Sequence, residues 1–321
     1  MRALLYAGSA IEERELPSPI LKPGQLRLKV RASGVNRADL GQRKGVYPPP
    51  PGESDIPGME AAGVVAEAGA GTSRFKPGDR VMALLGSGGY ADEVCVDEGL
   101  ALPLPERLSF AQGAGIPETF VTAHLNLFQI AGLQSGRRAL IHAGASGVGT
   151  SAIQLLRARG IEVFATAGTA DKIALCARLG ARAINYKEEK FDDAVLKGTD
   201  GAGVDAIIDP VGASNLDADL RCLAAGGWLV VIGTMGGKDA KVDLSALLRR
   251  RHRLAGSSLR GLPLKEKAGA VLKLEQDFMA EFADGRVAPV IDSVFSAARA
   301  AEAQDRMEKN LNAGKIVLTW D

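Results

Sequence analysis

The pattern of hydrophobic and polar positions changes character about a third of the way along the chain. As far as residue 117, short runs rich in Val, Leu and Ala are separated by Gly and Pro, which is typical of short strands joined by turns. The proline run 48–51 after Tyr47 predicts a stiff, extended loop. Strands are predicted at residues 25–31, 63–68, 80–84 and 90–96.

After residue 118, apolar runs of strand length alternate with amphipathic segments of helix length. This alternation predicts an α/β fold with a doubly wound parallel sheet of six strands. From residue 260 the chain returns to mixed helix and strand and ends in a predicted strand at 315–319. The sheet strands are predicted at 138–143, 162–168, 183–186, 204–209, 228–233 and 253–258, and the helices at 147–159, 171–179, 192–196, 215–223 and 244–250.

Composition and charge argue against several kinds of partner and site. The chain has 321 residues with 39 Lys and Arg against 38 Asp and Glu, so its charge gives no reason to expect nucleic acid or an anionic membrane as a partner. The basic run 249–253 closes a predicted helix, where it suits the helix dipole. Three widely spaced cysteines exclude a disulfide framework and fit a reducing, cytoplasmic setting. The three histidines are too scattered for a metal site by spacing, and His142, on a predicted buried strand, is expected to be a satisfied core residue.

A turn of small residues follows the strand 138–143 and opens the next helix, with the sequence Leu-Ile-His-Ala-Gly-Ala-Ser-Gly-Val-Gly at 140–149. Pyrophosphate binds backbone N–H groups at a helix N-terminus, and only small residues let it approach that closely. Such a turn alone could be a tight connection without a ligand, but this one opens the first of five successive strand–helix units. We therefore predict that a dinucleotide binds at Ala143, Ser146, Gly147, Val148 and Gly149.

The end of the next strand distinguishes NAD from NADP. An acidic side chain there would bind the ribose hydroxyls of NAD, but the strand ends at Gly168 without a carboxylate. Lys172 and Tyr186 instead offer a cation and a phenol to a 2′-phosphate. Asp171 could be mistaken for the acid of an NAD site, although its position suits a helix cap or first turn. A surface role for Lys172 is the alternative. The pattern favours NADPH.

With these residues in order, the chain resembles the zinc-independent medium-chain dehydrogenase/reductases of the quinone oxidoreductase (zeta-crystallin) type. The resemblance runs from end to end and rests on the segments 36–39, 58–63, 77–81, 122–123, 140–149, 185–186 and 314–317. It implies a GroES-like, partly open β-barrel catalytic domain formed by residues 1–117 and 260–321. It also implies an NADPH-binding Rossmann domain at residues 118–259, inserted between them.

The zinc-dependent relatives of that family carry Cys and His zinc ligands where this chain has Asn36 and Met59. Neither residue is a serviceable zinc ligand, so we expect no metal at this position. Without a Lewis acid, the acceptor must take hydride unaided, which suits quinones and activated enones. With the resemblance to the quinone oxidoreductases, an ortho-quinone is the acceptor expected first. The chemistry expected is direct hydride transfer from NADPH to a quinone.

Further site residues follow from the resemblance and from the sheet. Asn36 is expected near the acceptor as a donor to a quinone oxygen, with a turn-capping role as the alternative. Tyr47 could stack on the acceptor, or be an amphipathic surface residue. The predicted cofactor contacts also include Thr122 beside the nicotinamide ribose and Lys315 from the tail, each with an ordinary structural role as the alternative, and Gly233, Thr234 and Met235 after the fifth strand.

Two other functions stay open. The family contains enoyl reductases, so an NADPH-dependent reductase of activated carbon–carbon double bonds is one alternative. A non-enzymatic NADPH-binding protein, with a structural or RNA-binding role, is the other. The family also implies a homodimer joined through the last strand of the Rossmann sheet, here 253–258, if that strand is an exposed edge.

Overall fold

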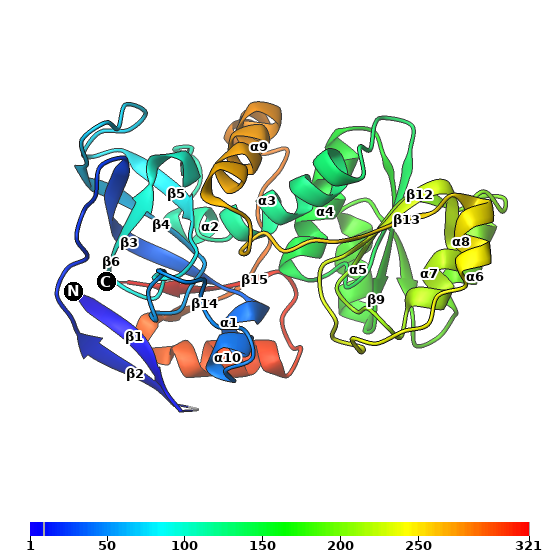
Figure 1. Cartoon of the computed structure of the whole chain (residues 1–321), viewed down its shortest axis with the longest axis horizontal. Coiled ribbons are helices and arrows are strands. Elements are labelled where there is room, and N and C mark those ends of the chain that lie inside the picture. Colours follow the sequence, from blue (N-terminus) through cyan, green and yellow to red (C-terminus); the bar gives the residue numbers. More distant parts are fainter. Residues whose placement is uncertain (9, 321) are drawn as a thin grey trace. The chain divides into compact units, whose positions relative to one another are not determined.

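The computed structural model describes residues 1–8 and 10–320 and divides into two compact units (Figure 1). The first contains Met1–Val121 and Leu259–Asp321, and the second contains Thr122–Ser258. The expected domain boundaries at 117 and 260 lie within four residues of these limits. The predicted α/β class is confirmed, with a six-stranded parallel sheet in the second unit and a unit formed by both ends of the chain beside it in the sequence.

The first unit is built on a seven-stranded sheet in the order β14-β15-β3-β4-β5-β7, with β6 paired to β3. The tail strand β15 pairs antiparallel with β3, so both ends of the chain contribute to one sheet. A separate hairpin joins β1 and β2. The bounds are β1 Arg2–Ala7, β2 Ala10–Glu15, β3 Gln25–Val35, β4 Glu60–Ala68, β5 Arg80–Leu84, β6 Glu93–Asp97, β7 Ala101–Pro103, β14 Ile291–Ser296 and β15 Lys315–Thr319.

Three predicted strands of this sheet have different bounds, among them β6, which begins at Glu93 instead of residue 90. β3 continues four residues past the predicted end because residues 32–35 pair with β15, more than 280 positions away in the sequence. β4 begins at Glu60, three residues early, because Glu60 pairs with Leu84 of β5. The local sequence pattern does not show which distant strand a residue pairs with, so it does not predict these extensions. The helices of this unit are α1 Arg37–Arg43, α2 Phe110–Gly113, α9 Leu264–Asp284 and α10 Ala300–Glu308, with short 3-10 turns at Glu98–Leu100 and Ala297–Arg299.

The second unit contains the six-stranded parallel sheet, in the order β10-β9-β8-β11-β12-β13. Its order reverses between β8 and β11, and ligands of such sheets bind at the carboxyl ends of the strands there. The strand bounds are β8 Arg138–Ile141, β9 Glu162–Ala167, β10 Arg182–Asn185, β11 Val204–Asp209, β12 Leu223–Val231 and β13 Arg253–Gly256.

Helices connect these strands as the alternation predicted. The helix predicted at 215–223 ends one residue early because Leu223 pairs with Val204 and begins β12, five residues before the predicted strand. Leu140, Phe164, Ile207 and Leu229, from four neighbouring strands, belong to the buried core. The bounds are α4 Gly147–Ala158, α5 Ala170–Arg178, α6 Phe191–Gly198, α7 Leu216–Cys222 and α8 Leu244–Arg250.

The helix α3, Pro117–His124, begins in the first unit and continues into the π-helical turn Leu125–Ile130 of the second. Among the described residues, the helices are all too short or too polar to cross a membrane.

Candidate functional site

The small-residue turn lies between β8 and α4 in the geometry that a phosphate-binding loop requires. Ala143 has a φ of +50°, so the chain reverses sharply as it leaves the strand. A Cβ on Gly149 would lie 2.4 Å from the carbonyl oxygen of Ala143, so only glycine fits there. Ser146 occupies the N-cap of α4, and its Oγ accepts from the N–H of Gly149 at 3.0 Å. Helix geometry leaves the N–H groups of Gly147 and Val148, in the first turn, for an anion.

The residues predicted to distinguish NADP from NAD gather at the carboxyl ends of β9 and β10. A Cβ on Gly168 would lie 2.5 Å from the hydroxyl of Tyr186, so the two residues are in contact. The Tyr186 side chain is exposed, and Lys172 is half-buried in the first turn of α5. Asp171 also lies in that first turn, one of the two positions that we expected for it. The edge therefore presents a phenol and a cation and, as predicted, no carboxylate at the end of β9.

The predicted segment after β12 lies at the same edge of the sheet. The N–H of Met235 donates to the carbonyl oxygen of Pro210 at 3.3 Å, which joins the loops that follow β12 and β11. Gly233 is in close contact with the same carbonyl, where a Cβ would lie 2.8 Å from it. Thr234 lies between them in the chain. Thr122 is half-buried in α3, and its carbonyl accepts from Asn126 Nδ2 at 2.7 Å. The cofactor contacts of these residues stay predictions.

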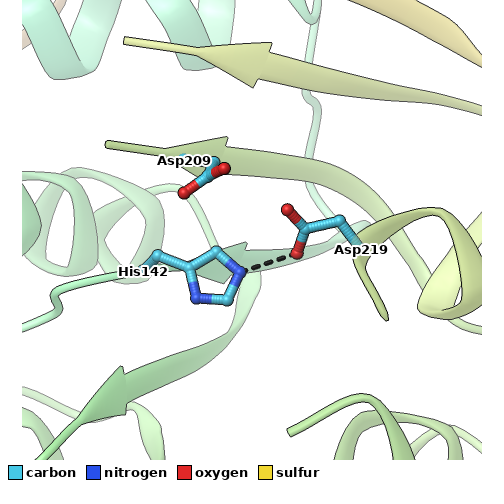
Figure 2. A group of neighbouring side chains, drawn as sticks. All are labelled: His142, Asp209 and Asp219. Atoms are coloured by element: carbon cyan, nitrogen blue, oxygen red, sulfur yellow. Dashed lines mark hydrogen bonds and ion pairs between the residues drawn. The ribbon is translucent and has the colours of Figure 1, made fainter. Parts of the chain in front are cut away.

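His142, the last residue before the phosphate loop turns, is buried among polar partners (Figure 2). Its Nε2 lies 2.7 Å from Asp219 Oδ1, and its Nδ1 lies 2.9 Å from Thr166 Oγ1. Asp209 holds its carboxylate in place by accepting from the N–H groups of Val211 and Gly212. The histidine thus ties α7 and β9 to the end of β8, confirming the prediction of a satisfied core histidine.

The tertiary structure also makes a possible metal site that sequence spacing did not reveal. One ligand atom each from His142, Asp209 and Asp219 lie within 4.8 Å of one another. Burial raises the pKa of Asp219, and its hydrogen bond to His142 opposes that rise. We assign the cluster to structure, because its hydrogen bonds join the elements that carry the phosphate loop.

A buried polar cluster in the first unit joins residues far apart in the sequence. Asn36, at the start of α1, donates from Nδ2 to Glu60 Oε1 at 2.9 Å. Lys315 Nζ donates to Asn36 Oδ1 at 2.7 Å, to Glu60 Oε1 at 2.5 Å and to the Val35 carbonyl at 2.9 Å. All three side chains are buried. The pairing of ammonium and carboxylate balances the buried charge, and the hydrogen bonds fix the orientation of the Asn36 amide.

These bonds bear on two predicted roles. The ammonium of Lys315 donates three hydrogen bonds, all to protein oxygens. Nδ2 of Asn36 also lies 3.5 Å from the Gly34 carbonyl oxygen, which accounts for its second hydrogen. A cofactor contact by Lys315 and donation by Asn36 to an acceptor oxygen are not favoured by this arrangement, and both stay predictions. The capping alternative for Asn36 agrees with its place at the N-cap of α1, where Asp39 accepts from its N–H, and its side chain also bonds to Glu60 and Lys315.

A second buried carboxyl group adjoins this cluster. Asp39 Oδ2 accepts from the N–H of Asn36 at 2.8 Å and from the hydroxyl of Tyr90 at 3.0 Å. Burial raises the pKa of Asp39 to about 6, although both hydrogen bonds lower it. Its Oδ1 has no hydrogen-bond partner among the described residues.

Sequence reasoning missed the functional interest of Glu60 and Glu118. Glu60 appears in the sequence only as one acid within an apolar run, and Glu118 as one acid beside a proline. In the structure, the N–H of Glu118, in the first turn of α3, donates to Glu60 Oε2 at 2.9 Å. Burial of the Glu118 carboxyl, and then the charge of Glu60, raise the pKa of Glu118 to about 8. A carboxyl group that stays protonated at neutral pH is a candidate acid.

Tyr47 lies before the proline run, whose residues 48–50 adopt no regular structure, as predicted. Its side chain is about one-third exposed, with the Arg260 guanidinium 5.2 Å from its ring centroid. Arg260 is itself buried and donates to the carbonyl of Gly86 and to Gln42. The Tyr47 ring is therefore accessible to solvent and is held by the Arg260 guanidinium. Its contact with an acceptor stays a prediction.

The residues present do not suit a zinc ion at Asn36 and Met59. The Met59 side chain is buried and offers only a weak thioether ligand. The ammonium of Lys315 already lies 2.7 Å from Asn36 Oδ1, and this positive charge would oppose a divalent cation there.

Comparison with known proteins gives two family matches. Residues 22–106 match the alcohol dehydrogenase GroES-like domain, and residues 147–276 match the zinc-binding dehydrogenase family. The quinone oxidoreductase of Sus scrofa is 33% identical over 310 residues, covering 95% of this chain and 92% of that protein.

Solved structures of the same fold include proteins described with either nicotinamide cofactor. A mycobacterial protein, Rv1454c, complexed with NADPH, has a TM-score of 0.89 and 27% identity, and each chain is fully covered. An NAD-dependent alcohol dehydrogenase has a TM-score of 0.87 and 29% identity, again with full coverage of both chains.

Proposed function

Because the chain belongs to the quinone oxidoreductase-like members of the medium-chain dehydrogenase/reductase family, we propose that it is an NADPH-dependent quinone oxidoreductase acting without a metal ion. Membership makes the chain a nicotinamide-dependent oxidoreductase. The choice of NADPH, of a quinone as acceptor and of zinc-free chemistry is our proposal.

NADPH fits the second unit at two places. The cradle at Gly149, with the first-turn amides of α4, suits a pyrophosphate. The edge formed by Gly168, Tyr186 and Lys172 suits a 2′-phosphate, because it offers two donors and no carboxylate at the end of β9. When bound, the cofactor supplies the hydride. The chain's own contribution is to hold the dinucleotide and to select its phosphate.

The buried cluster of Lys315, Glu60 and Asn36 is the observation that carries the zinc-free mechanism. The buried ammonium of Lys315 already supplies a positive charge beside Glu60 and Asn36. A divalent cation is therefore not needed to balance the Glu60 carboxylate. A site without a Lewis acid cannot stabilise a developing alkoxide, so its acceptors are molecules that accept hydride readily. Quinones meet that requirement, and ortho-quinones are the acceptors that we propose to test first.

The decisive experiment measures NADPH consumption by the purified protein with an ortho-quinone. NADH and an enoyl thioester serve as parallel controls. Rapid, NADPH-selective turnover of the quinone is the expected result. Turnover of the thioester alone would assign the chain to the enoyl reductases. NADPH binding without turnover of either acceptor would favour the non-enzymatic alternative. A salt-dependent affinity for RNA at residues 249–253 would then identify RNA as the partner.

We also propose a homodimer joined through β13. This strand is at the edge of the Rossmann sheet, and three of its four residues, Leu254 included, are exposed. An exposed edge strand presents unpaired backbone groups that a second copy can satisfy. Sedimentation of the wild-type chain and of Leu254→Lys tests this, with a dimer expected for the first and a monomer for the second.

A further inference from the structure

We propose that Glu118 donates the proton that completes reduction of the acceptor. This inference rests on the proposed function, because it assigns the acid of that reaction. The reduced acceptor needs a proton as well as a hydride, and the residue predicted to face its oxygen, Asn36, directs its amide to Glu60 and Gly34 instead. An amide does not give up a proton at neutral pH, so the proton comes from water or from an acidic side chain.

The polar cluster reaches the surface through Glu118. Asn36, Asp39, Glu60 and Lys315 are all buried, with exposures between 0 and 8%. Glu118 is half-buried, and it is bound to the cluster by the hydrogen bond from its N–H to Glu60 Oε2. A proton donor must exchange with the solvent that restores its proton, and among these five residues Glu118 is the one that is not fully buried.

Its carboxyl group is also uncommitted. None of the hydrogen bonds made by the described residues uses the Glu118 carboxyl oxygens, whereas Glu60 accepts from Asn36, Lys315 and the Glu118 backbone. Asp39 accepts on Oδ2 alone, from the N–H of Asn36 and the hydroxyl of Tyr90, and its Oδ1 is buried away from solvent. A carboxylic O–H without a protein acceptor is free to donate to a ligand.

The charges around Glu118 come from three elements and from the loop before α9, and together with burial they set its pKa. Glu60 of β4 and Asp39 of α1 raise its pKa, and burial raises it most. Lys315 of β15 and Arg260, before α9, oppose that rise. Asp39 and Glu60 belong to the same buried network, so ionisation of Glu118 would add a negative charge beside two existing acids.

The reaction balances with these groups. A bound nicotinamide cofactor would supply the hydride with its electron pair and be oxidised, which would leave the quinone as a hydroquinone anion. The O–H bond of Glu118 breaks, and its proton bonds to the anionic oxygen. The resulting carboxylate takes a proton from water. An activated alkene would receive the proton on carbon or on the enolate oxygen by the same step.

The test compares wild type, Glu118→Gln, Glu118→Asp and Tyr47→Phe across pH 6 to 10. Glu106→Gln, an exposed acid of the same unit, is the matched control. We expect the wild-type kcat/KM to fall as pH rises through about 8. Glu118→Gln should lose about 10²-fold in rate and lose this pH dependence, while its Kd for NADPH stays unchanged. Glu118→Asp should keep the pH dependence at a lower rate.

A readout without turnover separates this inference from the proposed function. Infrared difference spectra of the apoprotein between pH 6 and 10 should show a carboxylic acid C=O band that disappears near pH 8 and is missing in Glu118→Gln. If the wild type reduces no acceptor, the proposed function fails, and a Glu118 that is ionised at pH 6 would overturn the proton assignment separately. Turnover with an unchanged profile in Glu118→Gln, or loss of the pH dependence only in Tyr47→Phe, would also overturn it.

Discussion

Lys315 Nζ lies 2.5 Å from Glu60 Oε1, although the two residues are 255 positions apart in the chain. The antiparallel pairing of β15 with β3, and of β3 with β4, brings them together. Both side chains are almost entirely buried, so each charge depends on the other. The contact links the tail of the chain to the predicted catalytic residue Asn36.

Removing the ammonium from this pair should destabilise the first unit strongly. Lys315→Met leaves the Glu60 carboxylate buried without its charge partner, which costs about 3–5 kcal/mol when a buried pair is broken. Urea unfolding would measure the loss, with the exposed Lys309→Met as control. The double variant Glu60→Gln, Lys315→Met should recover part of it. A loss below about 1 kcal/mol in the single variant would contradict the pairing.

Lys172 should select the cofactor. Lys172→Ala removes the cation expected to bind the 2′-phosphate, so we expect its Kd for NADPH to rise at least about tenfold while its Kd for NADH changes little. Fluorescence titration of both cofactors would measure this. Lys197→Ala, an exposed lysine in the last turn of α6, is the control. An equal loss for NADPH and NADH would reject the assignment of the 2′-phosphate site.

Gly149 should tolerate no side chain. A Cβ at this position would lie 2.4 Å from the Ala143 carbonyl and 2.6 Å from that of Gly144, so Gly149→Ala must displace the phosphate loop. We expect NADPH affinity to fall more than tenfold, measured by calorimetry. Gly269→Ala in α9 meets open space and should bind NADPH as the wild type does. Normal affinity in Gly149→Ala would mean that the loop does not hold the pyrophosphate.

Asp39 should make stability depend on pH in the acidic range. Its folded pKa of about 6 lies above the ordinary value of 3.8, so the folded state binds more protons between these values. The free energy of unfolding contributed by Asp39 therefore falls as pH rises from about 4 to about 6, by roughly 2–3 kcal/mol. Asp39→Asn should flatten this part of the pH profile in urea titrations. A slope identical to that of the wild type would show that Asp39 is not a buried acid of raised pKa.

Local patterns in the sequence were sufficient to predict most strands and helices of the Rossmann unit. Its strands alternate with helices over short connections, so hydrophobic period and turn residues define each element with little outside help. The helix at Leu244–Arg250 and the strand at Val204–Asp209 have the predicted bounds. The Gly-rich loop was equally readable, because the steric demand at Gly149 comes from atoms only five or six residues away.

The tertiary structure alone decided what the polar residues do. Asn36 was singled out from the sequence, but its partners Glu60 and Lys315 come from strands 24 and 279 positions away. His142 was predicted to be a satisfied core residue, yet nothing near it in the sequence indicated Asp219, 77 positions away on α7. The protonation of Glu118 depends in the same way on burial and on Glu60.

Neighbouring residues encode the family motifs, the order of the elements and the phosphate loop, so all three could be predicted from the amino-acid sequence. Which buried charges meet, which donors already form hydrogen bonds and which acid keeps its proton became visible in the folded chain. Hydrogen bonds and pKa values depend on distance and desolvation in space, and sheet pairing brings together residues that no local pattern relates.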